Sequence, residues 1–348
     1  MSICRAQSTQ PSMSHTITEP FTAAKLLTLT IMVLMCIASS HAQQLGVRPQ
    51  AVTFQFQDVS VPGALETDAY AINDKNVIAG SYINKAGLEQ GMLISGQTVT
   101  PAPCPDGSTI YGLDSTGSGV GLCSTSVAAP PKGGVQPPGF VGDGWFWVYT
   151  PGAPWGNWLH ITISGCWPCN HTPLGVAPHT KTGVGTYTDA NGLIHGSVVT
   201  LATGAFQSLD VPGVDSGTIA WGINDSGLIT LEAPDDSGNV HSYLFDGNSY
   251  TQIDVPGAVQ SFAHGINNNG DVVYTYVDEA NNSHAALYLA STGTFVTVDD
   301  PKGVGATRGY GINDEVTGKN GNILEIVGEY SPNQGSQNNA FEATATIN

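Results

Sequence analysis

A short phrase that recurs along the chain constrains its fold more than any other feature. D-V-P-G begins at Asp210 and again at Asp254, 44 residues later. A second phrase, an aromatic residue or histidine followed by G-I-N-D or a close variant, recurs at 70–74, 111–114, 221–225, 264–268 and 310–314. Self-similarity at a fixed period of this length is typical of repeat proteins, in which each repeat supplies one unit of supersecondary structure.

Each complete repeat predicts four short β-strands. Its apolar stretches alternate with polar residues or end in Gly, Asn and Asp, which favour tight turns. Four strands in about 44 residues is the size of a β-propeller blade. The 110 residues from Asp114 to Asn224 hold a degenerate third repeat and an insertion rich in Pro, Gly and Trp at about 128–171. We therefore predict an all-β fold, a six-bladed β-propeller.

The two ends of the repeat region are complementary. The last repeat stops after the strand at 339–341 and lacks a closing strand with D-V-P-G, whereas the region begins with a strand and D-V-S-V-P-G at 54–63. Pairing this N-terminal strand with the last repeat closes the ring and removes a sheet edge that otherwise promotes aggregation. An open solenoid carries capping repeats instead. We expect residues 43–348 to form this single propeller domain, as a monomer.

The first 42 residues have the pattern of a secretory signal peptide. Lys25 precedes an apolar run at 26–38, and Ser40-His41-Ala42 is a small-x-small cleavage pattern. The run is too short to cross a membrane, which takes about 20 residues, and no later stretch reaches that length. Translation starts at Met1 or at Met13. We expect cleavage near Ala42 and a secreted protein, extracellular or periplasmic.

The composition excludes several classes of partner. Charged residues make up 11% of the chain and the net charge is -18, whereas an average protein has about 25% charged residues. An acidic protein repels phosphate backbones, so we expect no nucleic-acid binding. The acidic stretch 235–239 does not match a calcium-binding loop, and no phosphate-binding or zinc-hydrolase motif occurs. We expect no cofactor and no metal, and we attribute the glycines to turns.

Four cysteines follow the leader: Cys104, Cys123, Cys166 and Cys169. An even number of cysteines in an exported chain favours disulfides. Cys166 and Cys169 form either a local structural bridge or pairs with the other two. Their C-x-x-C spacing also occurs in thiol oxidoreductases and in zinc sites, here with His171 or His179 as further ligands. The surrounding residues lack the helix that lowers a thiol pKa, so we favour structural disulfides.

The recurring phrases resemble those of a bacterial family of extracellular repeat proteins, the HAF-repeat family, whose unit reads G-I-N-x-x-G-x-I-V-G-x-Y and then H-A-F. The match is best at 222–228, 265–276 and 326–330. The H-A-F element has counterparts that begin at His195, His241, His284 and Asn339. The resemblance implies secretion and a repeated β fold, and it implies no catalytic residues. A catalytic group needs an asymmetric environment that tunes its pKa, whereas a position that recurs in successive repeats indicates a repeated structural bond. We therefore expect these repeated histidines to be structural.

An aromatic residue or histidine stands three positions before the Asn or Asp of five repeats. These positions hold Tyr70, Tyr111, Trp221, His264 and Tyr310. A ring of such side chains around a central opening stacks on sugars or other ligands. The competing interpretation is packing between neighbouring blades, which every propeller needs. We favour packing and keep the five positions as candidates for ligand binding.

The insertion concentrates the tryptophans of the chain. Its 23-residue segment 145–167 holds five of them: Trp145, Trp147, Trp155, Trp158 and Trp167. Because exposed tryptophan is costly, this segment either builds a small core of its own or presents a binding surface. Long loops in compact domains are often functional. We keep Trp145, Trp147, Trp155 and Trp158 as candidates for a ligand platform.

The sequence favours a binding or interaction module over an enzyme. Carbohydrate or another cell-surface component, including a surface protein, is the expected ligand. The first alternative is an extracellular glycosidase or lyase, which needs two carboxylates roughly 5–10 Å apart across a sugar cleft; no catalytic residue can be assigned. The second is a purely structural repeat protein without a concave site. Rings and carboxylates that converge in one pocket favour the enzyme, whereas rings alone favour binding.

Overall fold

The computed structural model describes residues 51–104, 107–123, 143–150, 153–160, 171–177, 180–201, 203, 205–318, 321–333 and 337–348, with the backbone alone at 143–150, 153–160 and 318. All strands lie in the compact unit Gln50–Asn348, and the description is of that unit alone. Every regular element in these residues is a β-strand. The same residues contain no helix long and apolar enough to cross a membrane. The predicted leader, 1–42, lies outside them.

Four of the sheets are antiparallel and four-stranded, and each follows the order of the chain. The first two contain β2 (Glu66–Ile72), β3 (Val77–Ile83), β4 (Glu89–Ser95) and β5 (Thr98–Pro101), then β6 (Ser108–Leu113), β7 (Gly119–Cys123), β8 (Asp143–Thr150) and β9 (Ala153–His160). The next two contain β10 (His171–Ala177), β11 (Thr182–Thr188), β12 (Ile194–Thr200) and β13 (Ala205–Leu209), then β14 (Ile219–Ile223), β15 (Ile229–Pro234), β16 (Val240–Phe245) and β17 (Tyr250–Gln252).

The fifth sheet has nine strands and consists of two groups. One contains β18 (Gln260–Ile266), β19 (Val272–Val277), β20 (Ser283–Leu289) and β21 (Thr294–Thr297). The other contains β22 (Ala306–Ile312), β23 (Val316–Gly318), β24 (Gly321–Ser331), β25 (Asn339–Ile347) and the first strand of the chain, β1 (Val52–Val59). A single parallel bridge, Ser283 opposite Ala306, joins the two groups.

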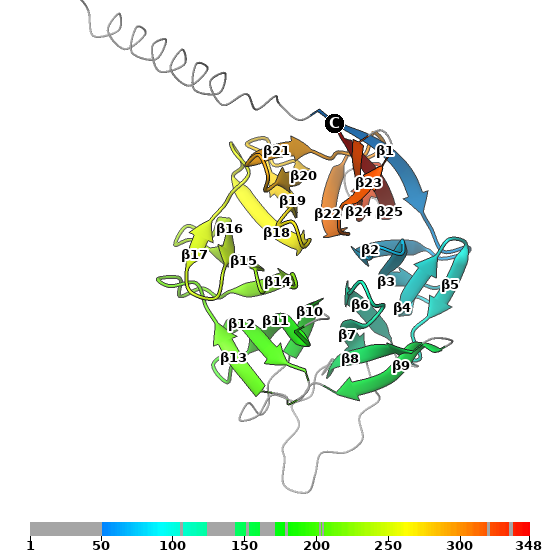
Figure 1. Cartoon of the computed structure of the whole chain (residues 1–348), viewed down its shortest axis with the longest axis horizontal. Coiled ribbons are helices and arrows are strands. Elements are labelled where there is room, and N and C mark those ends of the chain that lie inside the picture. Colours follow the sequence, from blue (N-terminus) through cyan, green and yellow to red (C-terminus); the bar gives the residue numbers. More distant parts are fainter. Residues whose placement is uncertain are drawn as a thin grey trace, which may run out of the picture. The chain divides into compact units, whose positions relative to one another are not determined.

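The sheets form a propeller-like arrangement around a common centre. Figure 1 shows the strands on the inside of the arrangement, each of which is the first strand of its group if β1 is set aside: β2, β6, β10, β14, β18 and β22. Because each group begins at the centre and then runs outward, the inner strands bring equivalent residues of successive repeats close together. The candidate site is built on these six strands.

Strand β1 belongs to the last group in the chain. It runs antiparallel to β25 from Val52 opposite Ile347 to Val59 opposite Ala340. The ring of Phe56 packs on that of Phe341, with centroids 5.7 Å apart. The first and last described strands of the chain therefore share one sheet and one apolar cluster.

The repeated Asn forms the turn that the sequence predicts. Asn73 Oδ1 accepts hydrogen bonds from the backbone N–H groups of Lys75 (3.0 Å) and Val77 (3.1 Å). Asn224 accepts from Ser226 and Leu228 in the same way. An Asx side chain that bonds its own backbone two residues on is the chemistry that favours a turn at this position.

Two strands of the second sheet lie inside the segment that the sequence marks as an insertion, 128–171. β8 pairs with β7 and with β9, so that Trp147 lies opposite both Gly119 and Trp158. The repeat phrase is missing there, and aromatic and β-branched residues in W-F-W-V-Y (145–149) carry the strand signal instead. The structure therefore differs from the expectation of a loop, because 143–150 and 153–160 complete the sheet of the second repeat.

The repeated histidines connect the outer strands of their repeats through contacts with aspartates. In three successive repeats Nδ1 lies within hydrogen-bonding distance of the Asp that ends the same repeat: His195 and Asp210 (3.0 Å), His241 and Asp254 (2.8 Å), His284 and Asp299 (2.7 Å). Nε2 faces an Asp of the preceding turn: Asp189 at 3.7 Å, Asp235 at 3.5 Å and Asp278 at 3.3 Å. We call these three units the histidine staples. Their repetition agrees with the structural role expected from the sequence.

One disulfide occurs among the described residues, between Cys104 and Cys123. Both side chains are buried. Cys104 follows β5 and Cys123 ends β7, so the bond connects the first sheet to the second. It realises one of the pairings that the sequence leaves open, whereas Cys166 and Cys169 lie outside the part of the chain that the structure describes.

Candidate functional site

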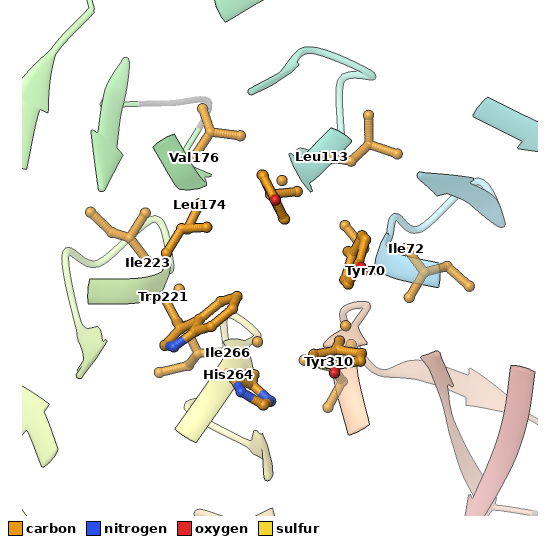
Figure 2. Close-up of a pocket in the computed structure, with 18 residues that line it drawn as sticks. Tyr70, Ile72, Leu113, Leu174, Val176, Trp221, Ile223, His264, Ile266 and Tyr310 are labelled. Atoms are coloured by element: carbon orange, nitrogen blue, oxygen red, sulfur yellow. The ribbon is translucent and has the colours of Figure 1, made fainter. Parts of the chain in front are cut away.

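The five candidate rings on the inner strands converge on one cavity. Strand β10 supplies a sixth residue, Leu174, at the equivalent position. The six residues at this position are Tyr70, Tyr111, Leu174, Trp221, His264 and Tyr310. We call them the aromatic layer. Figure 2 shows the side chains of Tyr70, Trp221, His264 and Tyr310 around the same central space. The volume of the cavity is about 80 Å³, which holds a few waters or one small chemical group.

The rings of the aromatic layer contact one another in an almost complete circle. Tyr70 lies with ring centroids 5.3 Å from Tyr111 and 5.2 Å from Tyr310. His264 lies 4.9 Å from Tyr310 and 4.6 Å from Trp221. These distances are those of favourable aromatic pairs. The sequence offers two interpretations of these rings, packing between repeats and lining of a central cavity. The same side chains therefore do both.

Glycine after four of the five rings allows the inner strands to approach so closely. A Cβ at Gly222 would lie 2.7 Å from the backbone oxygen of His264, and a Cβ at Gly265 would lie 2.6 Å from that of Tyr310. The same clash with the next inner strand recurs at Gly112, Gly175 and Gly311. Close backbone approach thus requires these glycines, and the expectation that turns account for the glycines is wrong for them.

A buried carboxylate supports Tyr310 from behind. The Tyr310 hydroxyl donates to Glu329 Oε1 at 3.2 Å, and Arg308 Nη1 donates to the same oxygen at 2.7 Å. Burial, with the charge of Glu329 nearby, raises the pKa of the Tyr310 hydroxyl well above its usual value. Tyr310 is therefore a neutral hydrogen-bond donor held in place by a carboxylate.

A second buried carboxylate supports His264. His264 Nδ1 lies 2.6 Å from the backbone oxygen of Gly309, and since a carbonyl only accepts hydrogen bonds, Nδ1 carries a proton. Nε2 lies 3.2 Å from Glu232 Oε1. Glu232 Oε1 has no hydrogen-bond partner among the described residues. The carbonyl of Gly309 therefore orients the His264 ring, and Glu232 lies beside its other nitrogen.

Asp68 is the third buried carboxyl group in this region. Its side chain lies on β2, two residues before Tyr70, and Oδ1 has no hydrogen-bond partner among the described residues. Burial, and then the charge of Glu329 beside it, raises the pKa of Asp68 to about 8. Asp68, Glu232 and Glu329 are 8%, 5% and 5% exposed, and none of them forms the cavity wall. The carboxyl groups thus lie behind the rings.

An aliphatic layer follows the aromatic layer along the centre. It consists of one residue from each inner strand, two positions after the ring: Ile72, Leu113, Val176, Ile223, Ile266 and Ile312. These residues also line a second cavity, on whose other side lie the repeated Asn and Asp residues. The aliphatic layer therefore separates an aromatic cavity from a polar one.

The polar residues of the second cavity are occupied with one another. The amides of Asn73, Asn224 and Asn267 donate to the backbone oxygen of the equivalent residue in the next repeat, at 3.0–3.3 Å. The Asp314 N–H donates to Asp74 Oδ1 at 2.9 Å and so joins the last repeat to the first. Groups that hold the repeats together are poorly suited to ligand binding, and the aromatic cavity is the better candidate.

The other predicted site residues lie elsewhere. Trp145 and Trp147 are on β8, Trp155 and Trp158 are on β9, and their side chains lie outside what the structure describes. His171 is buried on β10 with Nε2 3.0 Å from Ser197 Oγ. Within the described residues no group of three His, Cys, Asp or Glu side chains has a geometry that could hold a metal ion.

Two features of the site were not predicted from the sequence. Leu174 occupies the sixth position of the aromatic layer, and L-G-V at 174–176 has the same frame as W-G-I at 221–223, but Ala177 stands where the other repeats have Asn or Asp. Glu232 and Glu329 lie inside apolar strands. A carboxylate in such a stretch is a usable signal, because Glu is rarely buried without a partner.

Comparisons with known proteins give likenesses of structure alone. No family model matches the chain, and no curated protein matches it by sequence. Among solved structures, the chain is similar to TolB from Acinetobacter baumannii (14% identity, TM-score 0.44, 82% of this chain and 66% of that one). It is also similar to Trypanosoma rangeli sialidase (8%, 0.46, 86% and 60%) and to AofleA from Arthrobotrys oligospora (11%, 0.49, 85% and 92%).

The chain thus spans less than two thirds of the length of the TolB and sialidase chains. With every one of these TM-scores below 0.5, the likenesses carry no argument about function.

Proposed function

We propose that this chain is an exported binding module, a six-bladed β-propeller whose aromatic layer holds a ligand at the centre. One observation carries the proposal: rings from five different repeats converge on a single cavity. A fold that needed these positions only for packing could use aliphatic residues throughout, as β10 does with Leu174. Rings whose edges carry hydroxyl, indole and imidazole groups add the polar contacts that orient a ligand.

The architectural part of the proposal has two supports. Six groups of strands each place one inner strand at the centre. Strand β1 pairs with β25, the Asp314 N–H bonds Asp74, and Tyr310 packs on Tyr70, so contacts join the end of the repeat region to its beginning. We propose that these contacts close the ring through the N-terminal strand.

Carbohydrate, or another cell-surface component that displays one, is the ligand that we propose. Sugar rings present flat apolar faces that stack on aromatic side chains, and their hydroxyl groups match the polar edges of Tyr and Trp. The tryptophans of β8 and β9 are a second candidate platform. Export fits the disulfide between Cys104 and Cys123, since disulfides persist in oxidising compartments. Membership of the HAF-repeat family is part of this proposal and rests on the recurring phrases.

Intrinsic fluorescence of the purified protein, titrated with a panel of soluble polysaccharides and oligosaccharides, tests the proposal. We expect a saturable change with at least one saccharide, and about fivefold weaker binding after Tyr70→Leu, because one aromatic contact is worth on the order of 1 kcal/mol. Tyr187→Leu, on a strand that does not line the cavity, is the matched control. Binding that survives Tyr70→Leu but is lost after Trp155→Ala moves the site to β9, and no binding across the panel contradicts the proposal.

A glycosidase or lyase is the second candidate. The observation that favours it is the pair of buried carboxyl groups behind the rings, because burial raises the pKa of Asp68 to about 8 and Arg308 donates a hydrogen bond to Glu329. Glycoside hydrolysis uses two carboxyl groups: one is protonated and acts as the acid, and the other is an ionised carboxylate. Release of reducing sugar that is abolished by Asp68→Asn supports the enzyme; binding without release supports the binding module.

A further inference from the structure

We propose that the ligand group that enters the aromatic cavity is a positively charged amine. The inference rests on the proposed function and deepens it by naming the charge of the ligand. Five rings surround the cavity, and buried carboxyl groups lie behind the rings on two sides, Asp68 and Glu329 beside Tyr70 and Tyr310, and Glu232 beside His264.

The rings of the aromatic layer favour a cation over an anion. The face of an aromatic ring carries negative potential, and a cation within about 6 Å of the ring centroid is attracted to it, most strongly where water is excluded. Tyr70, Tyr310 and Trp221 are only partly exposed and present what remains exposed to the cavity. A cage of this kind binds ammonium groups, including quaternary ones, and has no corresponding attraction for an anion.

The carboxyl groups favour a cation as well. Arg308 is the cationic side chain that bonds Glu329, and the imidazole of His264 faces Glu232. Asp68 is hydrogen-bonded to Glu329, its other charged neighbours are the acids Glu66 and Glu89, and its Oδ1 lacks a hydrogen-bond partner among the described residues. A buried carboxyl oxygen without a hydrogen-bond partner is costly, and a bound ammonium group compensates that cost. The net charge of -18 also favours the approach of a cation.

The fold itself does not require these acids. Glu232 lies opposite Ile219 and Glu329 lies opposite Arg308, in each case two residues before the ring of the inner strand. The equivalent residue of β19, opposite Phe262, is Thr275, and that of β3, opposite Asp68, is Ser81. Because the same position is filled by a small neutral side chain in other repeats, the acids mark two sides of the cavity and not a repeated structural bond.

Binding of matched probes to the purified full chain tests the inference. Choline and its neutral isostere 3,3-dimethylbutan-1-ol differ in charge but hardly in shape, and glucosamine and N-acetylglucosamine provide the same comparison on a sugar. We expect each cation to bind about tenfold more tightly than its neutral counterpart, the range of a partly desolvated cation–π contact. Equal affinity within both pairs overturns the inference.

Asp68→Asn locates the effect. The substitution imitates the protonated carboxyl group and so should leave the fold intact, as far-ultraviolet circular dichroism checks. Unlike the acid, however, the amide cannot release a proton and become charged opposite a bound ammonium group. We expect choline to bind about fivefold to tenfold more weakly and the neutral isostere to bind unchanged. Asp225→Asn, which removes the same charge beside the second cavity, should change neither affinity. An equal loss in the two variants contradicts a site at the aromatic cavity.

The outcomes separate the inference from the proposed function. Saccharides that bind the protein, together with amines that bind no more tightly than their neutral counterparts, leave the binding module standing and overturn the charged ligand. Failure of both the amine probes and the saccharide panel overturns both.

Discussion

Replacing Gly265 with alanine tests the close approach of the inner strands. The new Cβ would lie 2.6 Å from the backbone oxygen of Tyr310, 3.2 Å from Gly311 Cα and 3.3 Å from Ile312 N. All three neighbours are backbone atoms, so no side-chain rotation relieves the contact. Overpacking of a tightly packed site costs about 1–3 kcal/mol, whereas alanine regains about 0.5–1 kcal/mol of glycine's entropic penalty in a strand. The net loss of unfolding free energy is therefore about 1–2 kcal/mol.

Urea denaturation measures this loss as a lower midpoint at an unchanged slope. Ala71→Gly is the matched control, because Ala71 is the natural residue at the equivalent position of β2, where a Cβ is accommodated. It should cost only about 0.5–1 kcal/mol, the entropic penalty of glycine. Gly265→Ala should also weaken ligand binding, since it displaces Tyr310. A Gly265→Ala protein as stable as the parent would refute the close approach on which the aromatic layer depends.

Three further predictions concern the contacts that hold the repeats together. Burial lowers the pKa of His241, but hydrogen bonds and charges of Asp254 and Asp235 outweigh burial and raise the pKa above its usual value. The protonated His241 therefore contributes its full stabilisation below about pH 6.5, and this contribution is lost as pH rises through the raised pKa. His241→Gln should thus reduce the unfolding free energy more at about pH 6 than at about pH 9, and an equal effect at both contradicts the staple. Cys104→Ser with Cys123→Ser should cost about 3 kcal/mol, measured by urea denaturation of the oxidised protein, and a change in stability within error would contradict the contribution of the bond. Phe341→Ala, at a fully buried side chain that packs on Phe56 of β1, should cost about 3–5 kcal/mol and accelerate proteolysis near residue 52; an unchanged cleavage rate would argue against the β1–β25 contact.

The recurring phrases predict the repeated strands because they record both the turn chemistry and the strand period. Asn73 and Asn224 form the turns that an Asx residue favours, and D-V-P-G follows the end of a strand, as at Leu209. Strands β8 and β9 were hidden because aromatic residues replace the repeat phrase there. Such a substitution preserves strand propensity while it removes every residue that identifies the repeat.

The candidate site could be predicted only in part. Spacing identifies Tyr70, Trp221 and Tyr310 as equivalent, but whether equivalent residues face a cavity or a neighbouring sheet depends on how closely the inner strands approach. The partners of the histidines illustrate the same limit: His241 and Asp254 are 13 residues apart, and only the strand register brings them together. The buried Asp68 and Glu329 are far apart in the sequence, so no local pattern connects them.

A crystal structure of the protein with a bound amino sugar or choline tests the central claim most directly. The account predicts the ligand in the aromatic cavity, with its ammonium group against the rings of Tyr70, Tyr310 and Trp221. A ligand seated on β8 and β9 or at the second cavity, with the aromatic cavity vacant, would contradict it.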